Sequence, residues 1–123
     1  FPQSDIVLMF AKPLDKNKYY FQPMFLANNF SSNLSITSIG YSGLLNKDVL
    51  SGQAPLTLSN TKGIIRSYFP HGRDKGLAWY PCAKISNSFS GGFSGGPTVI
   101  DNFPIVVGTN SISDGIEEGL ISP

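Results

Sequence analysis

The stretch Ser90-Gly-Gly-Phe-Ser-Gly-Gly-Pro97 places Ser94 between two pairs of glycines and ends in a proline. Residues 98–100, Thr-Val-Ile, follow directly and are typical of a β-strand. Glycines allow backbone conformations closed to other residues and let a second chain approach closely. A hydroxyl on such a turn, surrounded by backbone N–H groups, has the parts of a nucleophile and an oxyanion hole. The octapeptide alone fits a glycine-serine loop without chemistry equally well.

Length and composition indicate one globular domain. The chain has 123 residues, 41% hydrophobic and 14% charged, so it is long enough for one core and too apolar for a disordered segment. A net charge of +1 predicts no basic surface, so nucleic acid is not an expected partner. No apolar run approaches the length of a membrane span. We expect no metal and no cofactor, and we expect the single cysteine, Cys82, to be a small buried side chain.

Short runs of strand-forming residues recur along the chain, separated by clusters of Gly, Pro, Asn and Ser. Several alternate apolar and polar residues, as half-buried strands do, and none has the periodicity of an amphipathic helix. The expected strands are residues 4–10, 34–39, 55–58, 62–69, 77–80, 82–85, 98–100, 105–107 and 119–121. This spacing predicts an all-β barrel or sandwich.

The segment Gly92-Phe-Ser-Gly-Gly96 matches the G-x-S-x-G pattern of the α/β-hydrolase nucleophile elbow. That elbow needs a helix directly after the serine and a histidine later in the chain. Here Pro97 and a β-branched run follow, and no histidine follows His71. The sequence therefore excludes this elbow.

The same segment, extended to Pro97, resembles the Gly-Asp-Ser-Gly-Gly-Pro and Gly-Asn-Ser-Gly-Gly-Pro nucleophile motifs of trypsin-like serine proteases, including the high-temperature-requirement group. Ser4-Asp-Ile-Val-Leu-Met-Phe-Ala-Lys-Pro-Leu14 is similar to that family's segment around the triad aspartate, an acid followed by an apolar strand and a proline. Asp5 precedes Ser94, which is the order of the family. Weaker similarities to the family's strands lie at residues 39–42, 62–65, 107–111 and 119–123.

The resemblance extends over nearly the whole chain and implies a fold. It implies an all-β, six-stranded Greek-key barrel, the second barrel of a chymotrypsin-like double β-barrel. Residues 1–123 are then the C-terminal barrel of a trypsin-like peptidase domain whose N-terminal barrel is absent from this chain. Residues 1–30 are expected to hold the strand of the triad acid and the connector between the barrels.

The resemblance also implies a serine-type endopeptidase that forms an acyl-enzyme on Ser94. Asp5 is the implied triad acid, which orients the histidine and stabilises its charge. The backbone N–H groups of Gly92 and Ser94 are the implied oxyanion hole. The expected partners are a polypeptide substrate and the N-terminal barrel of the same protein.

Five further residues take implied roles in binding the substrate. Ser88, six positions before the nucleophile, lies where the family sets the floor of its primary specificity pocket, and Phe89 lies beside it. Because neither offers an anion, we expect no preference for Lys or Arg at the cleaved bond. Ser111, Ile112 and Ser113 match the strand that pairs with an extended substrate by β-addition.

Two departures from the family pattern limit these expectations. Phe93 stands where animal trypsins carry an aspartate, so activation by an ion pair to a newly formed amino terminus is not expected. The family's histidine lies upstream of the aspartate, whereas His71 lies downstream in a polar loop and is expected to be a surface residue. Either the chain is the C-terminal half of a longer protease, which we favour, or it is an inactive homologue that binds peptides. An unrelated all-β structural domain is a third alternative.

Overall fold

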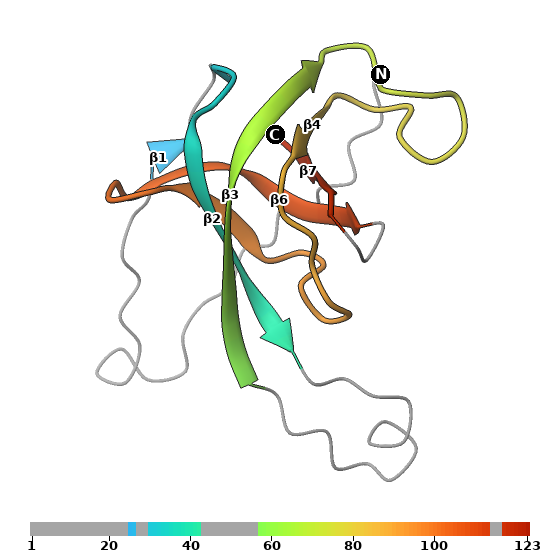
Figure 1. Ribbon diagram of the computed structural model, residues 1–123. Helices are drawn as coiled ribbons and strands as arrows, with labels where there is room; N and C mark the ends of the chain where they lie inside the picture. The colour runs from blue at the N-terminus through green and yellow to red at the C-terminus, as the bar shows by residue number, and fades with distance from the viewer. Residues whose placement is uncertain (1–24, 27–29, 43–56, 114–116) are drawn as a thin grey trace, which may run out of the picture.

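The computed structural model describes residues 25–26, 30–42, 57–113 and 117–123. Every regular element in this part of the chain is a β-strand (Figure 1). The strands are β1 (Phe25–Leu26), β2 (Ser35–Ser42), β3 (Thr57–Phe69), β4 (Cys82–Ile85), β5 (Pro97–Ile100), β6 (Ile105–Ser113) and β7 (Gly119–Ser122). A search of these residues for a helix able to span a membrane finds none. The prediction of an all-β fold is thus confirmed.

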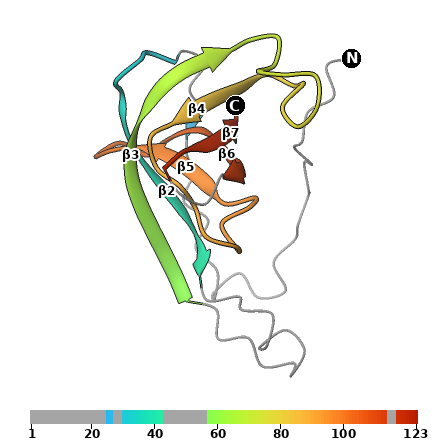
Figure 2. The same ribbon diagram turned by 45° about the vertical axis from the view of Figure 1, so that its right-hand side comes forward.

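Six of the strands close into an antiparallel barrel. Around the barrel the order is β2, β3, β4, β7, β6 and β5, and β5 pairs with β2 to complete the ring. β1 adds to the outside of this ring as a short parallel partner of β6. Figure 2 shows how strongly β3 curves as it passes from one side of the barrel to the other. A bulge between Ile65 and Ser67 in β3 contributes to that bend.

The barrel interior is filled by side chains from alternate strand positions. Ile36, Ile65, Ile85, Val107 and Ile121 are almost fully buried and form one cluster. A second cluster, at the end of the barrel where β3 gives way to β4, contains Ala78, Tyr80, Cys82 and Leu120. Cys82 is buried as predicted, and its burial raises the pKa of the thiol.

Three expected strands differ in the structure. Residues 55–58 and 62–69 were expected as separate strands, but β3 runs unbroken from Thr57 to Phe69. The polar residues between them are paired with β2 through the register Asn60–Ile39 and Lys62–Thr37, so they continue the ladder. The expected strand at 77–80 is instead a loop, and the expected strand at 4–10 lies outside the described residues.

The β2–β3 hairpin extends beyond the barrel. β5 pairs with β2 only at Ile36–Ser38, and β4 pairs with β3 only from Ile65 onward. Residues 39–42 and 57–60 therefore form a two-stranded ribbon that points away from the other strands (Figure 1). We call this part the hairpin ribbon. It brings residues of β2 and β3 to the loop that carries Ser94.

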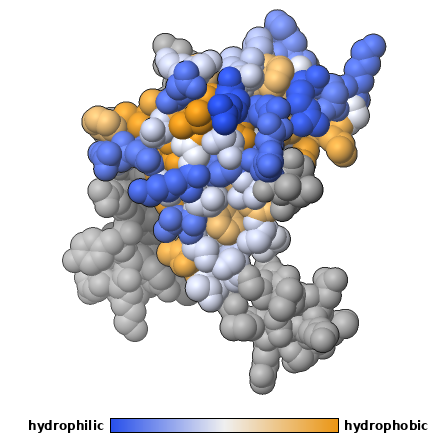
Figure 3. Space-filling model, in the orientation of Figure 1, coloured by the Kyte–Doolittle hydropathy of each residue, from blue (hydrophilic) through white to orange (hydrophobic). Residues whose placement is uncertain are grey.

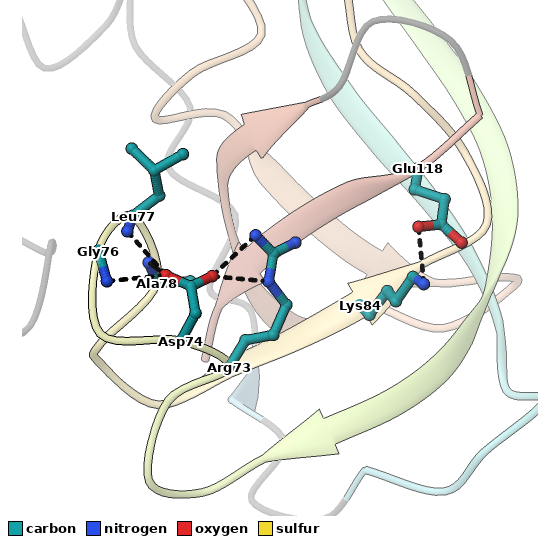
Figure 4. Close-up of polar contacts among 7 residues, drawn as sticks. All are labelled: Arg73, Asp74, Gly76, Leu77, Ala78, Lys84 and Glu118. Carbon is teal, nitrogen blue, oxygen red and sulfur yellow. Dashed lines mark hydrogen bonds and ion pairs between the residues drawn. The ribbon is translucent and has the colours of Figure 1, made fainter.

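Asp74 organises the loop between β3 and β4 (Figure 4). One carboxylate oxygen accepts hydrogen bonds from the backbone N–H groups of Gly76, Leu77 and Ala78 at 2.8–3.2 Å. The other forms an ion pair with Arg73 at 2.9 Å. These local hydrogen bonds satisfy the backbone that would otherwise pair in a strand, which explains why residues 77–80 do not form one.

The backbone N–H of Ala78, the Arg73 guanidinium and the N–H groups of Gly76 and Leu77 lower the pKa of Asp74 from 3.8 to about 2. Because the folded-state pKa is depressed, this carboxylate stabilises the protein above about pH 3.8, and the stabilisation is lost as the pH falls through about 2. The free energy of unfolding of the wild type should therefore rise between about pH 2 and pH 3.8, and Asp74→Asn should remove this rise. Urea unfolding of both proteins between pH 2 and 5 measures it; an unchanged slope in the variant would contradict the assignment.

Candidate functional site

Ser94 lies in the loop that joins β4 to β5, on a turn made by glycines. Gly92 and Gly95 have φ angles of 103° and 80°, in the left-handed region that other residues rarely adopt. The turn is closed by backbone hydrogen bonds from Phe93 N to Ser90 O at 3.3 Å and from Gly96 N to Phe93 O at 3.0 Å. The Ser94 side chain is exposed at the tip of this turn.

The residues around Ser94 separate into buried and exposed sides. Phe93 is only 4% exposed and stacks on Phe89, with ring centroids 6.0 Å apart, inside the barrel core. Because the buried Phe93 ring fixes the turn against the core, the adjacent Ser94 is held in an exposed position. Phe93 thus serves as a residue of the barrel core.

Some backbone N–H groups of this turn, that of Gly91 among them, donate to no acceptor within the described part of the chain. The N–H groups of Phe93, Gly95 and Gly96 all donate to carbonyl oxygens. Within the described part of the chain, the N–H groups of Gly92 and Ser94 donate to none. Unpaired N–H groups flanking an exposed hydroxyl are the arrangement that binds an oxyanion.

Asn110 of β6 holds the turn from beneath. Its side-chain amide donates to Ile39 O at 2.9 Å and to Phe93 O at 3.1 Å, and its Oδ1 accepts from the Thr98 hydroxyl at 2.6 Å. Its backbone N–H donates to Gly96 O at 2.8 Å, and its carbonyl accepts from Gly95 N at 2.9 Å. Asn110 is 2% exposed. A single buried side chain therefore ties the turn to both β2 and β5.

The polar contacts continue across the barrel. The Thr98 hydroxyl also bonds the Ser38 hydroxyl at 2.8 Å, and Asn87 Nδ2 donates to Ser38 Oγ at 3.3 Å. The sequence pattern did not single out Asn110, although residues 107–111 resemble a protease strand. An asparagine inside a strand-forming run was the available signal, because buried amides in strands need several partners.

A cleft of about 430 Å³ opens beside Ser94. Its walls come from the glycine turn on one side and from the hairpin ribbon on the other. The lining residues are Ile39, Gly40, Tyr41, Leu58, Gly92, Ser94, Gly95, Gly96 and Pro97. The structure thus brings together the predicted residues Gly92 and Ser94 and adds a wall from β2 and β3 that the sequence did not indicate.

The other predicted binding residues line none of this cleft. Ser88 borders a separate polar hollow, and Phe89 is 8% exposed with its ring in the core. The Ser111 hydroxyl hydrogen-bonds the Tyr80 hydroxyl at 2.6 Å, and Ser113 Oγ accepts from Phe89 N at 2.9 Å. Ile112 packs against the second core cluster. Ser88 and Phe89 are therefore not among the described residues that line the Ser94 cleft.

Asp5 lies outside the described residues, as do the rest of residues 1–24 and residues 27–29 of the segment 1–30 that was expected to hold the triad-acid strand and the connector. His71 is exposed in the β3–β4 loop, at the opposite end of β3 from the cleft residue Leu58. His71 lies on the surface as predicted, and it is not among the described residues that line the Ser94 cleft. The described residues contain no cluster of His, Cys, Asp or Glu able to hold a metal ion.

Neither the known protein-family models nor the curated proteins give a match to this chain. The protease family of the sequence resemblance thus receives no independent support from these comparisons.

Gly40 allows the hairpin ribbon to touch the Ser94 turn. A Cβ at this position would lie 2.5 Å from Phe93 Cα and 2.6 Å from Phe93 Cγ. We expect Gly40→Ala to displace the turn and to lower the free energy of unfolding by about 2 kcal/mol, in the range of overpacked cores. Gly91→Ala is the matched control, because a Cβ there meets nothing within 4 Å. Urea unfolding measures both; equal stabilities would contradict the close approach.

Proposed function

We propose that the chain is the second, C-terminal barrel of a trypsin-like serine endopeptidase. The strand order supports the Greek-key topology of that fold, because β2, β3 and β4 are neighbours in sequence and β5 returns to lie beside β2. β7 then closes the ring between β4 and β6. This order is compatible with the implied double barrel, in which a preceding N-terminal barrel packs against this one.

One observation carries the catalytic assignment: the exposed Ser94 lies on a glycine turn in which the N–H groups of Gly92 and Ser94 donate to no acceptor among the described residues. Ser94 is the proposed nucleophile, and the N–H groups of Gly92 and Ser94 are the proposed oxyanion hole. Losing one such donor typically costs about 100-fold or more in rate. The buried ring of Phe93 and the Asn110 side chain fix these groups before a substrate arrives.

The remaining chemistry needs a general base. In the proposal a histidine of the N-terminal barrel, oriented by Asp5, takes the Ser94 proton while Oγ attacks the peptide carbonyl. The carbonyl oxygen becomes an oxyanion held by the two N–H groups. The C–N bond then breaks, the histidine gives its proton to the leaving amine, and water hydrolyses the acyl-enzyme by the reverse sequence of proton transfers.

Covalent labelling of the complete protein with a fluorophosphonate tests this proposal. The reagent forms a bond to an activated serine Oγ with loss of fluoride, and peptide mapping should place the label on Ser94. A folded, complete protein that is not labelled would refute the catalytic proposal. Binding of extended peptides without labelling or hydrolysis would instead support the inactive, peptide-binding homologue.

A further inference from the structure

The cleft beside Ser94 has an apolar wall that the proposed catalytic groups do not use. Tyr41 of β2 and Leu58 of β3 are direct cross-strand partners on the hairpin ribbon. Tyr41 is 47% exposed and Leu58 is 66% exposed, yet both line the cleft that also contains Ser94. Ile39 and Pro97 complete the apolar part of the lining. Exposed apolar side chains gathered around a nucleophile are available to a ligand.

The charge of the lining distinguishes this cleft from the neighbouring hollow. None of the described residues that line the Ser94 cleft is an Asp, Glu, Lys or Arg. The separate hollow beside Ser88 is bordered by Lys62, Arg66, Glu117 and Glu118. Figure 3 shows that the face of the barrel seen in Figure 1 is hydrophilic over much of its area, with its apolar side chains interrupted by hydrophilic ones. The Ser94 cleft is therefore suited to an uncharged, apolar group.

Hydrogen bonds join the hairpin ribbon to the turn that carries Ser94. The backbone N–H of Tyr41 donates to Gly92 O at 3.2 Å, which ties the hairpin ribbon to the turn. The Asn110 amide bonds Ile39 O on the ribbon and Phe93 O on the turn. Because these bonds fix the two sides relative to each other, a side chain bound against Leu58 is also positioned relative to Ser94 Oγ.

We propose that the Tyr41–Leu58 wall is a specificity subsite that accepts the uncharged, apolar side chain of a residue flanking the scissile bond. The inference rests on the proposed function and adds the class of substrate to it. Leu58 contributes the more accessible apolar surface, and Tyr41 contributes its aromatic side chain. Aliphatic and aromatic residues are the expected occupants, and acidic or basic residues are disfavoured because no described lining group compensates a buried charge.

Cleavage profiling of the complete protein with a peptide library tests this subsite. We expect Leu or Phe to be preferred about 10-fold or more over Glu and Lys at one position next to the cleaved bond. In Leu58→Lys, the ratio of cleavage with Glu to cleavage with Leu at that substrate position should be about 3-fold higher than in the wild type, as expected for one exposed ion pair. Leu77→Lys is the matched control, because Leu77 is 70% exposed and does not line the cleft.

The outcomes separate this inference from the proposed function. Labelling by a small uncharged fluorophosphonate reports on Ser94 itself and should be equal in the wild type and in Leu77→Lys, which does not line the cleft. If the wild type is labelled but cleaves without preference at either flanking position, the subsite is refuted while the catalytic proposal stands. The same conclusion follows if Leu58→Lys and Leu77→Lys give identical profiles. If no variant is labelled, the proposed function itself fails.

Discussion

Replacing Ser94 with alanine should abolish fluorophosphonate labelling and lower peptide hydrolysis by roughly 10⁶-fold, the size of effect seen when a serine nucleophile is removed. The reason is that acylation needs an oxygen at the tip of the glycine turn, next to the N–H groups of Gly92 and Ser94. The backbone of the turn does not depend on the Ser94 side chain, which is exposed and has no hydrogen bond within the described structure. The variant should therefore fold normally and still bind substrate.

Ser90→Ala is the matched control for this experiment. Ser90 stands in the same loop, is also exposed, and contributes its carbonyl to the turn through the bond from Phe93 N. The Ser90→Ala variant should be labelled by the fluorophosphonate and should hydrolyse peptides at a rate close to that of the wild type. Turnover that survives in Ser94→Ala would refute the nucleophile assignment, and loss of turnover in both variants would show that the loop as a whole is responsible.

Replacing Asn110 with alanine should give the largest loss of stability, about 3 kcal/mol in the free energy of unfolding. The substitution leaves the Thr98 hydroxyl without its acceptor and two carbonyls, Ile39 O and Phe93 O, without a side-chain donor. It also opens a cavity at a position that is 2% exposed. Urea unfolding followed by tryptophan fluorescence measures the change.

Asn110→Asp separates the hydrogen bonds from the size of the side chain. The carboxylate is nearly isosteric and can accept from Thr98, but it cannot donate to the two carbonyls and faces them with negative charge. We expect it to be at least as destabilising as alanine. Asn60→Ala, at an exposed position of β3, should change the stability by no more than about 0.5 kcal/mol. If Asn110→Asp retained full stability, the proposed clamp on the Ser94 turn would be refuted.

A readout beyond stability tests whether Asn110 positions the nucleophile. In conditions where Asn110→Ala is fully folded, the rate of fluorophosphonate labelling of Ser94 should fall more than the affinity for peptides. Such a split is expected because the side chain acts on the carbonyl of Phe93 and touches no substrate. A stable variant with unaltered labelling would limit Asn110 to a structural role.

Several features of the fold could be predicted from local patterns. The apolar–polar alternation of residues 34–39 predicted a half-buried strand, and β2 (Ser35–Ser42) alternates in burial, with Ile36 buried and Thr37 half-buried. The glycines of residues 91–96 predicted a turn, and two of them have left-handed backbone conformations. These predictions succeed because the side-chain period of two and the conformational freedom of glycine are properties of single segments.

Other features could not be predicted from local patterns. The joining of two expected strands into β3 depends on pairing with β2, which overrides the polar residues at Asn60 and Lys62. The loop at residues 77–80 depends on one carboxylate, that of Asp74, which takes three backbone N–H groups. In both cases partners outside the segment decided the backbone conformation.

The sequence by itself determined that the chain is all-β and that Ser94 stands on a glycine turn ahead of a strand, because these follow from residue types and their spacing. Only the tertiary structure decided what surrounds that serine. The closed barrel brings Asn110, distant in sequence, beneath the turn, and the register of β2 with β3 places Leu58 opposite Tyr41 at the mouth of the cleft. Contacts between segments far apart in the chain are set by strand pairing and burial, and the pattern of one segment does not record them.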